Sequence, residues 1–212
     1  MNQLSVTVEY FASNSGIETR TYASEVEDIS ISSNLTDDNS KPQFGVICQY
    51  GSLTLNDHDG KILKLAEEKK LRADMPVTIR LGDEIIGIFV TDKWDYSYGS
   101  NLVKVTLKDK ILYWDNFNFS KADDKFVYAE EKEKWETGLV IFCRLNNFLY
   151  DALKYMVECD EDCKTKLKNI RIKAPAFREY NLRQAWENFC NVTQMVVYTH
   201  PDGKIKIKKR FS

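Results

Sequence analysis

Alternation of apolar and polar residues with a period of two is the feature that most restricts how this chain can fold. The pattern runs through Leu4–Tyr10, Val26–Ile31 and Leu102–Lys108, and Phe44–Leu55 also has strand character although Gly51 interrupts it. Successive side chains of a strand point to opposite faces, so this period is typical of a strand with one buried face. The first 115 residues are therefore predicted to form mainly β-sheet.

A long hairpin is expected at the centre of this β block. Met75–Leu81 is predicted to be a strand, followed by a turn and by the strongly apolar strand Glu84–Thr91. The polar and aromatic segment Asp92–Asn101 is expected to connect this strand to the returning strand Leu102–Lys108. Apolar residues occupy both faces of Glu84–Thr91, which predicts that both faces are covered. The residues expected on one face are Ile86, Ile88 and Val90, and those on the other are Ile85 and Phe89.

Helical periodicity is clear in two segments. Lys61–Leu71 has apolar residues at helical spacing, and an aspartate of the Asp-Gly turn at 56–60 can cap it. Asn181–Val192 begins with a capping asparagine and has an apolar stripe that contains Trp186 and Phe189, which are expected to be core residues. Together with the strands, these helices indicate an α+β class that is rich in β-structure.

Residues 116–138 are charged and aromatic and show no period, so they are predicted to be a linker or domain boundary. This boundary separates a β domain at 1–115 from a smaller α+β subdomain at 139–212.

Within the smaller subdomain, Leu139–Val157 is expected to be helical in its second part, with Asn146 or Asn147 marking an early turn. Glu158–Cys163 is expected to be an acidic loop. Lys204–Lys208 (KIKIK) is predicted to be a strand with its isoleucines inward, and its lysines are of the kind that keep a sheet edge unpaired.

Composition excludes several classes of protein. The chain is 43% hydrophobic, enough for a real core, and its longest unbroken apolar stretch, Leu139–Cys143, is far shorter than a membrane span of about 20 residues. No signal peptide is visible at the N-terminus.

The five cysteines are odd in number and widely spread, which favours thiols in a reducing compartment. Cys159 and Cys163 form a C-x3-C pair, but a metal would need two further ligands nearby.

Charge is unevenly distributed along the chain. Residues 164–212 hold twelve Lys or Arg and three Asp or Glu, a net charge of +9, which leaves −11 on the other 163 residues. Such asymmetry is compatible with nucleic-acid contact, with a basic surface docking on an acidic one, or with ordinary solvated faces, and charge alone favours the last.

The sequence contains no catalytic motif, and we expect that the chain is not an enzyme and needs no cofactor or metal. Both histidines, His58 and His200, stand in Asp-Gly turns. The aromatic run Trp94, Tyr96 and Tyr98 is a candidate protein interface because tyrosine and tryptophan bury much area with few rotatable bonds. These side chains equally suit packing on their own sheet, and carbohydrate stacking is a third, less favoured reading.

Two stretches of the chain resemble phage tail proteins. Residues 51–111, with VTIRLGDEIIGIFVTD at 77–92 and NLVKVTLKDKIL at 101–112, are similar to the tube-forming domain of baseplate hub and tail-tip proteins. Residues 181–207, a helix followed by a strand, an Asp-Gly turn and a strand, resemble a motif of the hub's second domain. Together the two stretches cover about two fifths of the chain.

The resemblance implies a tube-type β-sandwich or split barrel with a helix, followed by the smaller subdomain. It also implies that the protein has a structural role in the virion tail and is made in the cytoplasm of a bacterial host. Copies of the chain would form a trimeric or hexameric ring that continues the tail tube and contacts neighbouring tail proteins. Ile86, Ile88 and Val90 join Trp94, Tyr96 and Tyr98 as candidate interface residues. DNA would pass the lumen without specific binding, since the acidic first part would repel it.

Two alternative functions remain open from the sequence. The first is a receptor- or carbohydrate-binding module of a tail, and the second, less favoured, is a cell-wall hydrolase.

Overall fold

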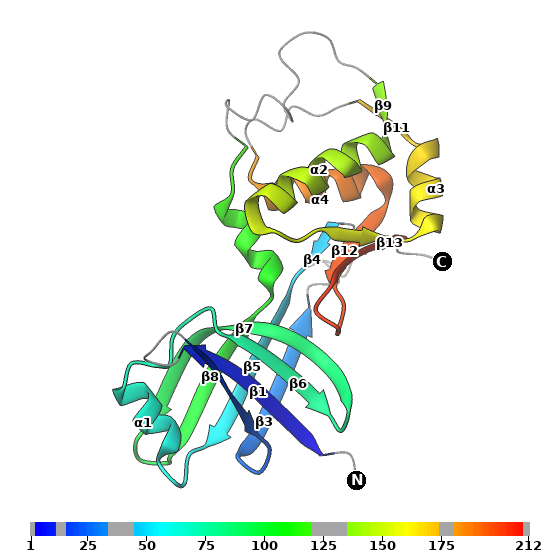
Figure 1. Ribbon diagram of the computed structural model, residues 1–212. Helices are drawn as coiled ribbons and strands as arrows, with labels where there is room; N and C mark the ends of the chain where they lie inside the picture. Colours follow the sequence, from blue (N-terminus) through cyan, green and yellow to red (C-terminus); the bar gives the residue numbers. More distant parts are fainter. Residues whose placement is uncertain (1–2, 12–15, 34–44, 120–134, 174–179, 210–212) are drawn as a thin grey trace. The chain divides into compact units, whose positions relative to one another are not determined.

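The chain passes several times between two units of structure (Figure 1). The first unit comprises Met1–Ser33, Gln49–Lys110 and His200–Gly203, and the second comprises Asn34–Cys48, Ile111–Thr199 and Lys204–Ser212. The computed structural model describes residues 3–11, 16–33, 45–119, 135–173 and 180–209. Residues 120–134 of the predicted linker therefore lie outside the described residues, and the predicted boundary at 116–138 stays a prediction.

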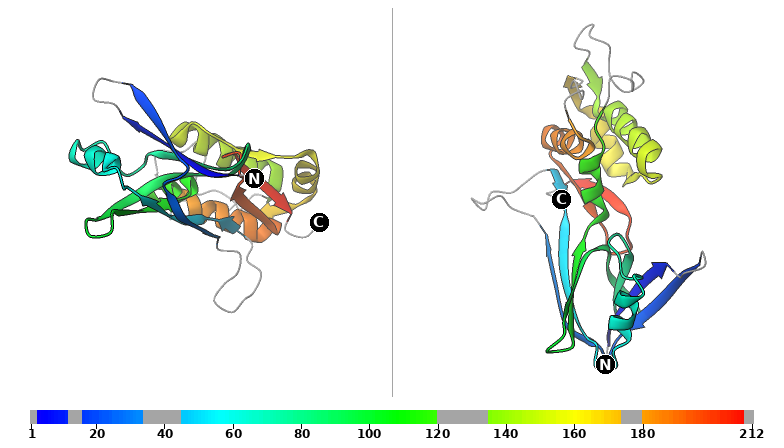
Figure 2. Two further views of the ribbon diagram at one scale, coloured as in Figure 1. Left: turned by 90° about the horizontal axis from the view of Figure 1, so that it is seen from below. Right: turned by 90° about the vertical axis from the view of Figure 1, so that its left-hand side faces the viewer.

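Seven antiparallel strands form the sheet of the first unit, in the order β2-β1-β6-β7-β8-β5-β3. Strands β2 and β3 are its two edges, and in the right-hand view of Figure 2 the blue β1–β2 hairpin and β3 lie on opposite sides of this unit. No described strand closes the sheet into a barrel. The predicted α+β, β-rich fold is thus confirmed, with an open sheet. The strands are β1 (Leu4–Phe11), β2 (Ile17–Tyr22), β3 (Val26–Ser33), β5 (Gln49–Asn56), β6 (Pro76–Leu81), β7 (Glu84–Ser97) and β8 (Leu102–Lys108).

Helix α1 (Lys61–Glu67) begins as the sequence predicts, because both carboxylate oxygens of the buried Asp57 accept backbone N–H groups. Oδ1 accepts from Ile62 N at 2.8 Å and Oδ2 from Leu63 N at 2.8 Å. The helix ends at Glu67 rather than at the predicted Leu71, because Lys69 adopts a left-handed φ of 55°. Such a residue closes a helix by satisfying its last carbonyls.

The core of the first unit lies on one face of the sheet. Apolar residues from six strands, the α1 side chain Ile62 and Met75 make up a single buried cluster. Its members are Val6, Val8, Tyr22, Leu53, Leu55, Ile62, Met75, Val77, Ile79, Phe89, Val103, Val105 and Leu107.

The second unit packs helices on a four-stranded sheet with the order β10-β13-β12-β4, and a two-stranded ribbon pairs β9 with β11. Strands β10 and β4 run parallel to their neighbours, whereas β12 and β13 are antiparallel. The strands are β4 (Gly45–Ile47), β9 (Trp135–Thr137), β10 (Val157–Cys159), β11 (Arg171–Lys173), β12 (Met195–Thr199) and β13 (Ile205–Lys209). The helices are the 3-10 helix η1 (Lys110–Asn116), α2 (Gly138–Leu153), α3 (Glu161–Asn169) and α4 (Leu182–Thr193).

Helix α4 matches its prediction closely. Asn181 caps it and forms a capping box with Gln184, whose side chain accepts from Asn181 N at 3.0 Å. Trp186 and Phe189 are buried, as predicted for core residues.

Three local predictions about the second unit are wrong. The acidic segment predicted as a loop instead starts α3, because the side chain of Asp160 accepts from Cys163 N at 2.7 Å and caps the helix. The strand segment Phe44–Leu55, whose first residue lies outside the described residues, is interrupted not at Gly51 as expected but at Cys48, between β4 and β5, which lie in different sheets. Strand β13 is not an edge but lies between β10 and β12. Its lysines point out of the sheet plane, so they leave the in-plane N–H and C=O groups able to pair.

Asn146 is not at a turn but is buried in the middle of α2. Its side-chain amide reaches the first residue of β10, donating from Nδ2 to Val157 O at 2.8 Å and accepting at Oδ1 from Val157 N at 2.7 Å. A polar side chain is tolerated here because both ends of its amide are paired.

Candidate assembly interface

The two edges of the seven-stranded sheet offer backbone groups to another strand. Strand β2 (IETRTY) and strand β3 (VEDISISS) contain neither lysine nor proline, the residues that commonly protect a sheet edge. Each carries one isoleucine that water reaches: Ile17 on β2 is 65% exposed and Ile31 on β3 is 40% exposed. An extended edge with exposed apolar side chains is suited to pairing with a strand of another chain.

A β-bulge decides where the aromatic residues of β7 point. Thr91 pairs with Leu107 of β8, but the next paired residue of β7 is Lys93, so Asp92 is an extra residue. One inserted residue reverses the alternation of a strand. Trp94 and Tyr96 therefore reach the buried cluster, on the same face as Thr91. The predicted connection Asp92–Asn101 is thus wrong, because β7 continues to Ser97.

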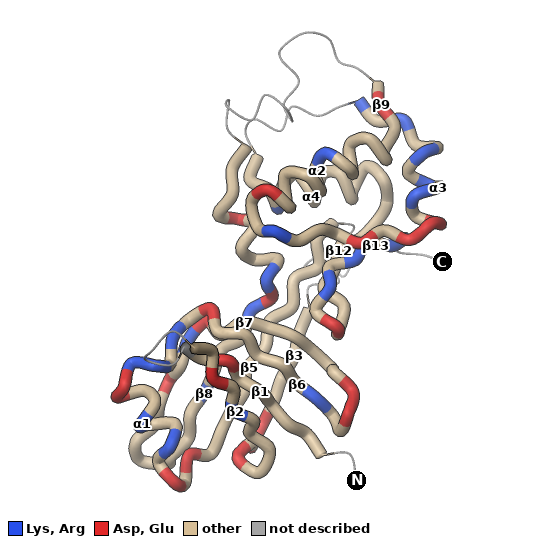
Figure 3. Tube along the Cα trace, viewed as in Figure 1, with Lys and Arg blue, Asp and Glu red and all other residues tan. Residues whose placement is uncertain are grey.

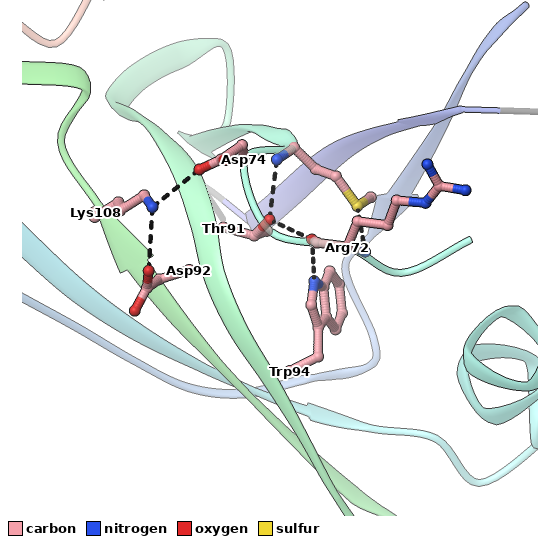
Figure 4. A network of polar contacts seen from close by, with 7 residues as sticks. Arg72, Asp74, Thr91, Asp92, Trp94 and Lys108 are labelled. Atoms are coloured by element: carbon pink, nitrogen blue, oxygen red, sulfur yellow. Dashed lines mark hydrogen bonds and ion pairs between the residues drawn. The ribbon is translucent and has the colours of Figure 1, made fainter. Parts of the chain in front are cut away.

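Figure 4 shows how the bulge is fixed by the segment that precedes β6. The buried hydroxyl of Thr91 accepts from Met75 N at 3.0 Å and donates to Arg72 O at 2.8 Å. The indole Nε1 of Trp94 donates to the same carbonyl of Arg72 at 3.1 Å. Because two side chains of β7 meet one carbonyl, the segment 72–75 and the bulge are held together.

On the other side of the bulge, Lys108 of β8 lies between two carboxylates. Its Nζ is 2.9 Å from Asp74 Oδ1 and 3.1 Å from Asp92 Oδ1. Burial lowers the pKa of Lys108, but hydrogen bonds to Asp74 and Asp92 outweigh that effect and raise the pKa above its usual value. The bulged residue Asp92 is thus paired within the chain.

The predicted aromatic interface residues separate into two groups. Trp94 and Tyr96 are partly buried against the core of their own unit, whereas Tyr98, in the turn after β7, is 76% exposed. The rings of Tyr96 and Tyr98 are 4.9 Å apart. Tyr98 therefore exposes an aromatic ring to solvent, and this ring lies next to that of Tyr96.

The predicted aliphatic interface residues lie before the bulge. Ile86, Ile88 and Val90 are all partly buried. The expected common face of these three is wrong for Ile86, because Ile86 is an extra residue at a second register shift of β7 and packs against the buried cluster that contains Phe89. Ile88 contacts the turn His200–Gly203 of the same unit, since a Cβ atom at Gly203 would lie only 2.8 Å from Ile88 Cδ1. The structure thus does not gather the six candidate residues into one patch, and their interface role stays a prediction.

Ile17 and Ile31, the exposed isoleucines of the edge strands, were not among the residues selected from the sequence. Alternation identifies a strand but carries no information about its place in the sheet. No sequence signal of the chain marks β2 and β3 as edges.

The described residues show no chemical centre. No group of three or more His, Cys, Asp or Glu among them could hold a metal ion. Within the same residues, no helix is long and apolar enough to cross a membrane. In the second unit, basic residues lie within α3 (Lys164, Lys166 and Lys168) and within β11 (Arg171 and Lys173), and Figure 3 colours Lys and Arg blue.

Comparison with known proteins yields matches only at the level of structure. No protein-family model matches the chain, and no curated protein does. The 43 kDa tail protein of prophage MuSo2 from Shewanella oneidensis matches with a TM-score of 0.54 and 10% identity, over 99% of this chain and 56% of that one. A tail protein from Neisseria meningitidis matches with a TM-score of 0.55 and 12% identity, over 97% of this chain and 50% of its own.

A prophage tail protein from Listeria monocytogenes also matches, with a TM-score of 0.51 and 10% identity, over 97% of this chain and 50% of its own. The chain has the fold of prophage tail proteins. It spans about half the length of each of these three proteins.

Proposed function

We propose that the chain is a structural component of a phage or prophage tail, in which it contributes to a baseplate hub or tail tip. Copies of the chain assemble into a trimeric or hexameric ring that continues the tail tube and contacts neighbouring tail proteins. The chain is made in the bacterial cytoplasm and then belongs to the virion tail. It catalyses no reaction and requires no cofactor, and DNA passes through the ring without specific binding.

The observation that carries this proposal is the open seven-stranded sheet, whose two edge strands contain neither lysine nor proline and interrupt their charged residues with an exposed isoleucine each, although β3 also has a bulge between Val26 and Asp28. A closed ring of identical subunits pairs one edge of each copy with an edge of the next, so that no edge remains exposed. The exposed Ile17 and Ile31 add apolar contact at these edges. The fold shared with three prophage tail proteins supports the setting in which such a ring would be built.

The test is the mass of the full chain in solution, measured by native mass spectrometry and by light scattering, with negative-stain images of any rings. We expect trimers or hexamers that persist in about 0.5 M salt, because screening weakens ion pairs but not strand pairing or apolar burial. Ile17→Lys and Ile31→Lys should each shift the population toward monomer, since an edge lysine opposes pairing.

Val192→Lys is the matched control. Val192 is 58% exposed on α4, so this substitution also introduces a charge at an exposed aliphatic residue, but on neither edge strand. Thermal unfolding of all three variants should match that of the unsubstituted chain. A monomeric chain at high concentration, or assembly that Val192→Lys weakens as much as the edge variants do, would contradict the proposal.

A second candidate function rests on Tyr98. An exposed aromatic ring in a turn is suited to stacking on a sugar or a receptor side chain. Glycan-array binding that Tyr98→Ser abolishes, by a chain that stays monomeric, would favour a receptor- or carbohydrate-binding module instead.

A further inference from the structure

Two cysteine thiols meet where β10 joins α3. Cys159 is the last residue of β10 and Cys163 lies in the first turn of α3, with the capping residue Asp160 between them. The residue before a helix cap lies over the first turn of that helix. The Cys159 thiol lies 3.6 Å from Asp160 O at the start of α3, and Cys163 is near enough to contribute to the raised pKa of Cys159.

Strand β13 fixes both cysteines from the other side. Cys159 is the register partner of Ile207, and Cys163 Sγ is 3.6 Å from Ile207 O. The backbone of Cys159 and the sulfur of Cys163 therefore both lie beside Ile207 of the central strand, so the sheet as well as the local turn brings the two cysteines together.

The two thiols differ in access to solvent. Cys163 is 2% exposed, whereas Cys159 is partly exposed. An oxidant can thus reach Cys159, and the neighbouring thiol of Cys163 is placed to complete a second step. Cys143 is exposed on α2, and Cys48 and Cys190 are buried, so Cys143 serves as a reference for simple surface reactivity.

We propose that Cys159 and Cys163 are a covalent modification site, an oxidisable dithiol that closes to an intrachain disulfide when the protein meets a low-molecular-weight disulfide such as oxidised glutathione. The Cys159 thiolate attacks one sulfur of glutathione disulfide, forming a mixed disulfide and releasing one glutathione. The Cys163 thiolate then attacks Cys159 Sγ and expels the second glutathione. The two cysteines lose two electrons, glutathione disulfide gains them, and the two thiol protons end on the released glutathiones.

Disulfide formation does not depend on the proposed function, but the proposed function indicates when the cysteines would meet an oxidising environment. A tail protein is made in a reducing cytoplasm and is later carried on a particle outside the cell, where disulfides persist. Closure would then join the end of β10 to the first turn of α3 after assembly.

Burial also makes this dithiol slow to react near neutral pH. Burial, and secondarily the neighbouring Cys163, raises the pKa of the Cys159 thiol to about 12, and burial raises the pKa of Cys163 as well. The thiolate is the attacking species, so the rate of closure should rise about tenfold for each unit of pH between 7 and 9.

The test treats the full chain with oxidised glutathione at pH 8, denatures it, alkylates the remaining thiols with N-ethylmaleimide and maps the peptides by mass spectrometry. We expect a Cys159–Cys163 disulfide, with neither residue alkylated or glutathionylated. Cys163→Ser should trap glutathione on Cys159, Cys159→Ser should leave Cys163 alkylated, and the matched variant Cys143→Ser should close as the unsubstituted chain does.

Circular dichroism before oxidation establishes that each serine variant is folded. Stable glutathione on Cys159 of the unsubstituted chain, or full alkylation of both cysteines while Cys143 has reacted, would overturn the inference. The mass of the assembly is measured on the same samples, so that failure of disulfide closure and failure of ring formation are distinguished.

Discussion

Asn146 should be one of the most sensitive polar positions of the second unit. Its amide holds both backbone groups of Val157, at 2.8 and 2.7 Å, where β10 begins at the edge of the four-stranded sheet. Asn146→Leu conserves most of the volume but leaves one buried N–H and one buried C=O without their partner. Each such group costs about 1–3 kcal/mol, so the free energy of unfolding should fall by about 2–4 kcal/mol, allowing for partial relaxation.

The assay is urea denaturation of the two variants Asn146→Leu and Asn147→Leu side by side, with amide hydrogen exchange at Val157 as a local readout. Asn147 is the neighbouring residue of α2 and is exposed, so its substitution should change the free energy of unfolding by less than about 0.5 kcal/mol. Exchange at Val157 should accelerate only in Asn146→Leu. Equal stability of the two variants, or unchanged exchange at Val157, would refute the reasoning.

Substitutions at Trp186, Asp57 and Tyr22 test the two cores and the α1 cap. Trp186→Ala should lower the free energy of unfolding by about 3–5 kcal/mol, as measured by chemical denaturation. Trp186→Phe should cost less in the same assay, because the buried Nε1 has no hydrogen-bond partner among the described residues. An unchanged melting temperature of Trp186→Ala with lost assembly would contradict the assignment of Trp186 to the core. Asp57→Ala should lower the free energy of unfolding by about 1–3 kcal/mol, because two α1 N–H groups lose their acceptor. In the same chemical denaturation assay, Asp59→Ala should lower it by less, because Asp59 is more exposed. Burial raises the pKa of Tyr22 from 10.0 to about 12, so the folded chain keeps a proton that the unfolded chain loses. The stability from this residue is therefore present below pH 10 and is lost as the pH rises toward 12, by up to about 2–3 kcal/mol; urea denaturation across this range should show a smaller decline for Tyr22→Phe.

Sequence reasoning succeeded where the determining contacts are local. The cap at Asn181 and the inward isoleucines of β13 each depend on residues only a few positions apart, so spacing alone reveals them. For α1, spacing limits the capping residue to Asp57 or Asp59. The strand and helix periods indicated the α+β class, and the resemblance to phage tail proteins agrees with the fold that the chain shares with the three matched tail proteins.

Sequence reasoning failed where distant residues decide the outcome. The sequence predicts that Asp92 begins a loop. In the structure Asp92 is a bulged residue that pairs with Lys108, and β7 continues beyond it. Asn146 reads as a turn residue because its partner Val157 is not visible from composition. The edge positions of Ile17 and Ile31 follow only from the order of the strands, which no local pattern encodes.

The pairing of β4 with β12 has a consequence for biosynthesis. All seven strands of the first sheet lie within residues 4–108, so this sheet can form while the rest of the chain is still being translated. Strand β4 leaves the ribosome early but finds its partner only when Met195–Thr199 has been made. A nascent chain therefore carries β4 unpaired until Met195–Thr199 has been made, and the second sheet is completed after the first.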